Sequence, residues 1–328
     1  MGANGSPNVR RILSIDGGGI KGVFPASFLA TVEGVVGHNI ADYFDLIVGT
    51  STGGIIALGL GLGLSASEML EFYEKYGPSI FAGHRRWRGM RSLGFVKYDR
   101  APLERALIEV FGERKIGESR KRLVIPSLNA ETNEVHIWKT SHHPRFQLDY
   151  KCKVVEAALA TAAAPTFFPT YRADSGIPLI DGGMWANNPV TVGVVEAIGI
   201  LGWPREDLRV LSLGCTTAAL NMKWALSRFA GKLRWANKVA DVFMAAQESS
   251  AVGMAQHLVT DRNNVVRISP SVGTRYELDD FRAISNIRGL GVTEARKALP
   301  SLRLMFIDCG VAEPFEPCHR LESKSGLG

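Results

Sequence analysis

The chain has 328 residues, of which 46% are apolar, and a formal charge of +6 from 38 basic and 32 acidic side chains. This length suits one large domain or two small ones, and the moderate positive charge suits an anionic partner without identifying it. The longest apolar run, 55–64, is too short to span a bilayer. No C-x-x-C or Cys/His metal spacing occurs among the four cysteines, Cys152, Cys215, Cys309 and Cys318, so we expect reduced thiols and no metal.

Apolar runs alternate with helix-compatible stretches along the chain, which predicts an α/β fold. Strands are expected at 11–15, 46–48, 123–128, 135–138, 178–180, 210–213, 265–269 and 274–278. Helices are expected at 23–35, 54–62, 67–77, 101–111, 154–163, 191–201, 224–258 and 291–302. We see no repeat and no linker, so we expect one domain over 10–312, preceded by a disordered lead, 1–9, and followed by a tail, 313–328.

A glycine-rich loop, Asp16-Gly-Gly-Gly-Ile-Lys-Gly22, follows the first predicted strand and precedes a helix. This arrangement points free backbone N–H groups at an anion. Gly17, Gly19 and Gly22 fit the dinucleotide-binding pattern G-x-G-x-x-G, which requires an acidic residue at the end of the next strand. Asp42 precedes that strand instead, as does Asp45.

A phosphate-binding P-loop is also disfavoured, because no Gly-Lys-Ser/Thr follows the glycines. The remaining use of the loop is an oxyanion hole, which holds the negative oxygen of a tetrahedral intermediate with N–H donors. A serine nucleophile needs such donors, so the glycine loop and a serine elbow would explain each other.

The second predicted strand ends in Gly49-Thr-Ser-Thr-Gly53, a G-x-S-x-G sequence between an apolar strand and an apolar helix. In a nucleophile elbow, the serine stands at a sharp strand-to-helix turn that flanking glycines permit. Short Gly/Ser turns also occur by chance, but the strand and the helix on either side favour the elbow. We therefore predict that Ser51 is a nucleophile, with Gly49 and Gly53 forming the turn.

A serine nucleophile needs a base, and no histidine of the chain is followed by the glycine loop typical of a triad. The seven histidines give no reason to choose one of them. Asp181 is the better prediction, because it ends an apolar run and precedes Gly182 and Gly183, which allow close approach of another loop. Taken alone, this segment would be an ordinary Asp-Gly turn.

Together these residues resemble the patatin-like phospholipases. The three blocks that begin at Asp16, Gly49 and Asp181 occur in the family's order, and Ala163-Ala-Pro-Thr-Phe-Phe-Pro169 and Asn187-Asn-Pro189 are also similar to family segments. The resemblance extends from about residue 10 to 309. It implies a three-layer α/β/α fold with a mainly parallel central sheet.

The resemblance also implies the chemistry. Ser51 would attack an acyl ester of a phospholipid, and Asp181 would serve as the base in a Ser–Asp dyad, without a cofactor. The oxyanion would be held by the loop Gly17, Gly18, Gly19, Lys21 and Gly22, chiefly by the N–H groups near Gly18 and Gly19.

Two segments combine basic and aromatic residues. One contains Arg85, Arg86, Trp87 and Arg88, and the other spans 223–235. Both are typical of a membrane-interface surface, although a solvated basic face or an active-site lid has the same composition. The arginines and the tryptophan of the first segment also suit contact with the phosphates and the base of a nucleotide.

This basic insertion in a compact bacterial-type domain resembles the effector phospholipases of cyclic-nucleotide anti-phage signalling. The resemblance implies a cytoplasmic enzyme that acts at the membrane surface, is activated by a cyclic dinucleotide and can form a homo-oligomer. A long nucleic acid partner is not expected, because no DNA- or RNA-binding motif is present. Two alternatives stay open: a carboxylesterase for soluble esters, and a non-enzymatic nucleotide-binding module.

Overall fold

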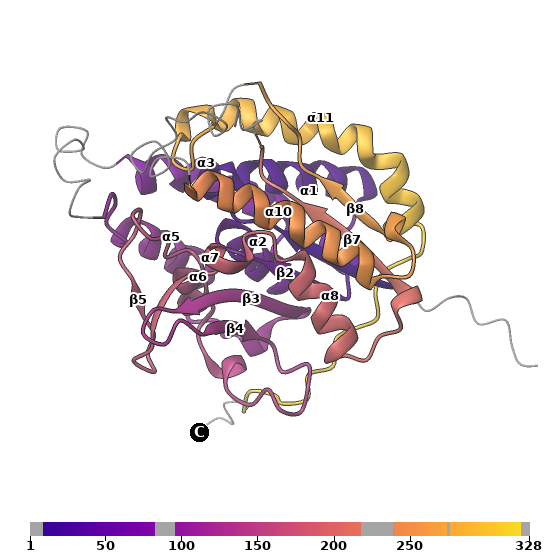
Figure 1. The fold of residues 1–328 in the computed structure, drawn as a ribbon, viewed down its shortest axis with the longest axis horizontal. Coiled ribbons are helices and arrows are strands. Elements are labelled where there is room, and N and C mark those ends of the chain that lie inside the picture. Colours follow the sequence, from indigo (N-terminus) through magenta and orange to yellow (C-terminus); the bar gives the residue numbers. More distant parts are fainter. Residues whose placement is uncertain (1–8, 83–95, 218–238, 274–275, 323–328) are drawn as a thin grey trace, which may run out of the picture.

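A mixed β-sheet runs through the protein between two layers of helices (Figure 1). This computed structural model describes residues 9–82, 96–217, 239–273 and 276–322. The sheet order is β5-β6-β3-β2-β1-β7-β8, and β4 pairs with β3. The strands are β1 (Arg10–Ile15), β2 (Leu46–Gly49), β3 (Arg122–Asn129), β4 (Val135–Lys139), β5 (Tyr171–Arg172), β6 (Pro178–Asp181), β7 (Leu208–Leu213) and β8 (Val265–Ile268).

The five strands from β3 through β2, β1 and β7 to β8 are parallel to their neighbours, whereas β4, β5 and β6 pair in antiparallel fashion. The helices are α1 (Val23–Val36), α2 (Thr52–Gly61), α3 (Ala66–Phe81), α5 (Ala101–Phe111), α6 (Val154–Thr161), α7 (Gly183–Ala186), α8 (Val190–Gly199), α10 (Val239–Leu258) and α11 (Ile284–Leu302).

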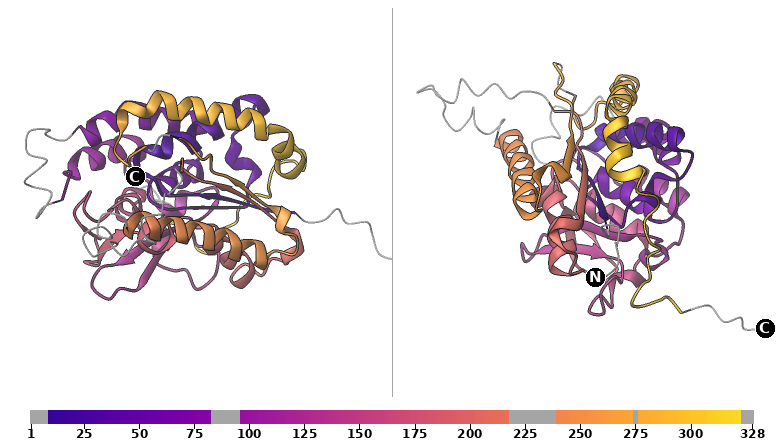
Figure 2. Two further views of the ribbon diagram at one scale, coloured as in Figure 1. Left: turned by 45° about the horizontal axis from the view of Figure 1, so that its top comes forward. Right: turned by 90° about the vertical axis from the view of Figure 1, so that its right-hand side faces the viewer.

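Successive residues of one strand enter two different cores, because side chains alternate across a sheet. On β2, Ile47 joins the large core beneath α1, α2, α3 and α11, while Leu46 and Val48 join the smaller core beneath α8 and α10. Figure 2 shows the two helix layers on opposite sides of the strands. The predicted three-layer α/β/α fold is confirmed.

The predicted strands agree with the structure to within one or two residues, except at two places. The short strand β5 was not predicted, and residues 276–278 are not in a strand, while 274–275 lie outside the described residues. The predicted 224–258 helix is described from Val239 onward. Helix α3 continues through Pro78 to Phe81, since Ile80 and Phe81 are buried and this burial offsets the disruption by proline.

Helix α11 begins at Ile284, seven residues before its predicted start. Gly289 and Gly291 weaken the helical pattern in the sequence. In the fold, Gly291 lies against α1, where an added Cβ would be 2.8 Å from the carbonyl oxygen of Phe24. Close packing on α1 therefore stabilises a helix whose own sequence favours it weakly.

By length and hydropathy, one described helical stretch, Gly19–Val36, could cross a membrane. It contains α1, and the side chains of Phe24, Phe28 and Leu29 are fully buried in the large core. The fold therefore uses this stretch as a core helix.

The chain after α11 lies along the body of the domain. Glu313 pairs with Arg10 at 2.8 Å, and the Arg122 guanidinium lies 5.1 Å from the ring centroid of Phe315. His319 stacks on Tyr150. The described part of the predicted tail thus contacts β1, β3 and the turn that contains Tyr150.

Two strands that approach each other share one edge of β3. Val48 of β2 is paired with Val124, and Asp181 of β6 is paired with Ser127, while β4 occupies the opposite edge. Because β2 is parallel and β6 antiparallel to β3, their carboxyl ends face each other across about 10 Å of β3. The residues that follow both strands are therefore brought together.

We predict that Gly291→Val will destabilise the protein by about 1–3 kcal/mol, since the added side chain must separate α11 from α1. The matched control is Gly289→Ala, where no atom lies within 4 Å of the added Cβ. That change should stabilise by about 0.5–1 kcal/mol through helix propensity. Urea unfolding of both variants measures the difference, and equal effects would contradict close packing at Gly291.

Candidate active site

Ser51 stands at a sharp turn between β2 and α2. Its backbone angles are φ 54° and ψ −122°, a conformation that a non-glycine residue rarely adopts. Its N–H donates to the Thr161 hydroxyl at 3.0 Å, and its carbonyl accepts from the Ile55 N–H at 3.0 Å. A Cβ at Gly53 would lie 2.2 Å from the carbonyl oxygen of Ile15, so only glycine lets α2 approach the end of β1.

Asp181 ends β6 and accepts a hydrogen bond from the Ser51 side chain. The Gly183 N–H donates to the same carboxylate at 2.6 Å. Burial raises the pKa of Asp181 to about 6, and the two hydrogen bonds oppose this rise. No histidine of the described residues lines the cavity around Ser51. The fold therefore places the two side chains that the sequence singled out in the wall of one cavity.

Gly18 and Gly19 border the same cavity as Ser51. In the described part of the chain, no hydrogen bond uses the N–H of either glycine. Gly19 has φ +58°, which favours glycine, and its position lies close to the carbonyl of Leu278. These two N–H groups are available for an oxyanion beside Ser51.

The other residues of the predicted loop have different environments. The N–H of Gly17 donates to the Asn187 carbonyl at 2.9 Å, and the N–H of Lys21 donates to the Gly18 carbonyl at 3.2 Å. Gly22 packs against Thr52, where an added Cβ would meet the hydroxyl at 2.2 Å. The loop is thus fixed on both sides of Gly18 and Gly19.

The cavity around Ser51 and Asp181 has a volume of about 390 Å³. This lies within the usual range for small-molecule sites, about 300–1,000 Å³. Its wall is mostly apolar and comes from α2, α3, α5 and the segment between α6 and β5, with Ile55, Phe72, Tyr73, Ile80, Phe81, Leu103, Phe167 and Phe168. Such a wall suits a hydrocarbon chain beside the ester that a serine would attack.

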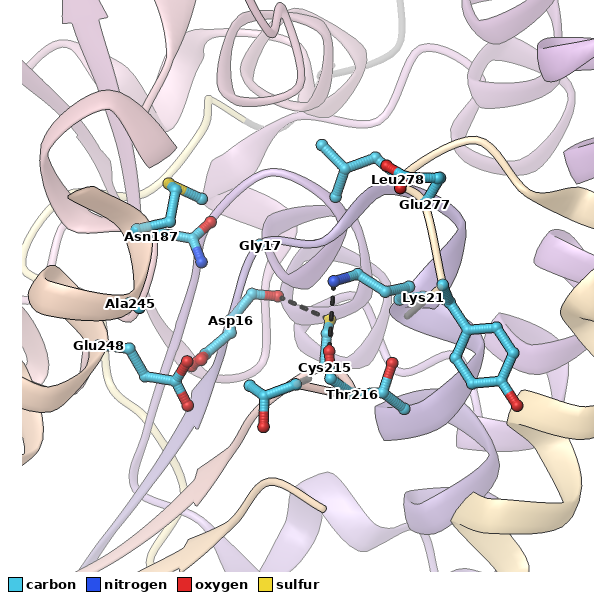
Figure 3. A pocket seen from close by; sticks show the side chains of 13 residues that line it. Asp16, Gly17, Lys21, Asn187, Cys215, Thr216, Ala245, Glu248, Glu277 and Leu278 are labelled. Carbon is cyan, nitrogen blue, oxygen red and sulfur yellow. Dashed lines mark hydrogen bonds between the residues drawn. The ribbon is translucent and has the colours of Figure 1, made fainter. Parts of the chain in front are cut away.

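A second pocket of about 170 Å³, which several charged side chains line, lies next to the glycine loop. Figure 3 shows Lys21 directed toward the 215–216 segment, with the carboxylates of Asp16 and Glu248 close together elsewhere in the pocket. The Lys21 ammonium donates to the Thr216 carbonyl at 3.3 Å. Lys21 therefore lines this pocket and not the Ser51 cavity.

Several residues that hold the site together were not found from the sequence. Arg267 of β8 binds both carboxylate oxygens of Asp16, and Thr161 links the elbow to β3. The sequence did hold a signal for Arg267, because it is a charged residue within the apolar run of β8. For Thr161 the sequence holds no signal, because it lies in an apolar helix. Arg85, Arg86, Trp87 and Arg88 lie outside the described residues.

The sequence matches the family described as patatin-like phospholipase over residues 13–194. This range contains the elbow, the glycine loop and the Asp-Gly-Gly block. The chain belongs to the patatin-like phospholipase family, as its motifs indicated.

Curated relatives extend the likeness over most of the chain. A cGAMP-activated phospholipase of Pseudomonas aeruginosa is 37% identical over 291 residues, which cover 87% of this chain and 85% of the relative. A cGAMP-activated phospholipase of Vibrio cholerae is 38% identical over 231 residues, covering 63% and 64% of the two chains. Patatin-like protein 4 of Arabidopsis thaliana is 27% identical over 334 residues, covering 87% and 82%.

We predict that ester hydrolysis will rise with pH through about 6 and level off above it. A base must be a carboxylate to accept the serine proton, and burial raises the pKa of Asp181 to about 6. The measurement is kcat/KM against pH with an ester that does not ionise. The pKa of Asp16 is also raised to about 6, so Asp16→Asn is the control and should keep this limb. A limb near pH 4 would contradict the assignment.

We predict that Ser51→Gly will be more stable than Ser51→Ala, although neither hydrolyses esters. Both lose the hydrogen bond to Asp181, so their difference isolates the backbone strain at positive φ, typically about 1–3 kcal/mol. At an unstrained position the alanine variant would instead be favoured by about 0.4–1 kcal/mol. Urea unfolding of the two variants decides between these results.

Proposed function

We propose that this protein hydrolyses fatty-acyl esters of membrane phospholipids through Ser51 and Asp181. The observation that carries the proposal is the position of Ser51 and Asp181 in the wall of one apolar cavity, beside the N–H groups of Gly18 and Gly19, which no hydrogen bond of the described residues uses. Membership of the patatin-like phospholipase family supports the reaction class.

The reaction follows from these groups. Asp181 accepts the hydroxyl proton as Ser51 attacks the ester carbonyl, and the N–H groups of Gly18 and Gly19 stabilise the tetrahedral oxyanion. The ester C–O bond then breaks, and Asp181 returns the proton to the departing lysophospholipid oxygen. Water attacks the acyl-enzyme with Asp181 again as base, which releases the fatty acid and restores Ser51.

A fully buried base suits this cycle. No cationic side chain of the described residues contributes to the pKa of Asp181, which is raised by burial alone. A carboxylate with a pKa of about 6 is a stronger base than an exposed aspartate and is still mostly ionised at pH 7. Asp181 can therefore serve as the base, the part that a histidine plays in a catalytic triad.

The regulatory part of the proposal is activation by a cyclic dinucleotide. The curated relatives from Pseudomonas aeruginosa and Vibrio cholerae are both named cGAMP-activated phospholipases. A protein of this kind would act from the cytoplasm on the inner face of the membrane, as an effector in anti-phage defence. The excess positive charge of the chain supports attraction to an anionic lipid surface.

We predict that the wild-type protein will release fatty acid and lysophospholipid from phospholipid vesicles, and that cGAMP will raise the rate. Lipid mass spectrometry measures both products. Ser51→Ala and Asp181→Ala should each lower the rate by more than about 10³-fold, since nucleophile and base act as a unit.

The same assay separates the alternatives. Hydrolysis of short soluble esters without any attack on vesicles would indicate a carboxylesterase. A rate that no cyclic dinucleotide changes would contradict the regulatory part alone. Nucleotide binding that persists in Ser51→Ala, with no hydrolysis by the wild type, would indicate a binding module.

A further inference from the structure

Two neighbouring residues of α10 bind two different parts of the site. The first is Gln247, whose side-chain oxygen accepts from the Asn187 N–H at 3.2 Å and whose amide donates to the Met184 carbonyl at 3.2 Å. Met184 and Asn187 belong to the α7 segment that follows Asp181, and both line the Ser51 cavity. Gln247 therefore fixes the segment that holds the base.

The second is Glu248, which accepts from the Arg267 guanidinium at 2.6 Å. Arg267 also donates to both carboxylate oxygens of Asp16, at 2.9 and 2.5 Å, and to the Ser212 hydroxyl at 2.8 Å. A bidentate pair of this kind fixes orientation as well as distance. Asp16 is the first residue of the glycine-rich loop, so its orientation sets the start of that loop.

The two connections meet again at the loop. The Asn187 carbonyl accepts the N–H of Gly17, the residue next to Asp16. The contacts thus form a closed ring, from Gln247 through Asn187 to Gly17, and from Asp16 through Arg267 to Glu248. Gln247 and Glu248 are consecutive on α10, and Asp16 and Gly17 are consecutive in the loop. The backbone therefore closes the ring at both ends.

The Arg267 side of the ring is mostly shielded from water. The Asp16 side chain is 3% exposed, that of Arg267 15% and that of Glu248 24%. In such surroundings a charge-assisted hydrogen bond is stronger than in water, and an unpaired charge is costly. The ring therefore restricts movement of the glycine loop relative to the segment that follows Asp181.

We propose that Gln247, Glu248 and Arg267 are positioning residues that hold the oxyanion loop and the base segment in register. The inference rests on the proposed function. In the described part of the chain none of the three lines the Ser51 cavity, so they act through Asp16, Gly17 and Asn187. A nearby alternative, the second pocket itself as a ligand site, is disfavoured because Arg267 already binds two of its carboxylates.

The test compares kcat and KM of Gln247→Ala and Glu248→Ala on one ester substrate. Each variant should lower kcat by about 10- to 100-fold with KM unchanged, since a misplacement of about 1 Å has this effect on a reacting geometry. Glu248→Gln keeps an acceptor for Arg267, and Gln247→Glu keeps the acceptor for the Asn187 N–H. Both conservative variants should recover part of the lost kcat.

Matched controls separate positioning from general stability. Gln256→Ala lies on the same helix, and no hydrogen bond of the described residues involves the Gln256 side chain, so its kcat should match the wild type. Gly291→Val lowers stability at the contact between α11 and α1, whose residues are not members of the ring. Where a ring variant and Gly291→Val have similar melting temperatures, the ring variant should show the much larger loss of kcat.

Hydrogen exchange gives a readout that does not require catalysis. Amides of 16–20 and 182–188 should exchange faster in Gln247→Ala and Glu248→Ala than in Gln256→Ala. Unchanged exchange together with unchanged kcat, or a loss of kcat explained by the unfolded fraction, would overturn the proposal. A wild type that hydrolyses no ester would refute the proposed function, whereas the exchange result would still decide on the ring.

Discussion

Strands β2 and β6 run toward each other along one edge of β3, and the proposed active site depends on this arrangement. The elbow at Ser51 lies where β2 ends, and Asp181 lies where β6 ends. The Thr161 hydroxyl bridges the gap, because it accepts the Ser51 N–H and donates to the Pro126 carbonyl at 2.6 Å. Proline is unusual in a central strand because it has no backbone N–H. Pro126 fits here because its nitrogen faces the gap between β2 and β6, where neither strand requires a donor.

Two buried aspartates of the site have pKa values raised to about 6, yet their surroundings give them different roles. Asp16 is held in one orientation by the Arg267 guanidinium, which opposes the effect of burial. Asp181 has the Ser51 hydroxyl and the Gly183 N–H as partners, so its carboxylate stays free to accept a proton. Burial makes the Asp181 carboxylate a stronger base. The ion pair with Arg267 instead fixes Asp16 in a structural role.

The differences between predicted and observed elements arise where tertiary contacts outweigh local preference. Two glycines and a proline conceal the true extent of α11 and α3 in the sequence. In the fold, Gly291 allows contact with α1, and the burial of Phe81 extends α3 beyond Pro78. The short strand β5 has two residues and no pattern of its own, since it exists only through pairing with β6.

By itself, the sequence determined the α/β class, the elbow, the glycine loop and the Asp-Gly-Gly block, because each depends on local turn chemistry and on neighbouring residues. The placement of Ser51 and Asp181 in the wall of one cavity and the ring through Arg267 were decided by the tertiary structure. These features depend on which strand ends meet on β3 and which helix covers them. Such pairings join residues far apart in the chain, and no local preference encodes them.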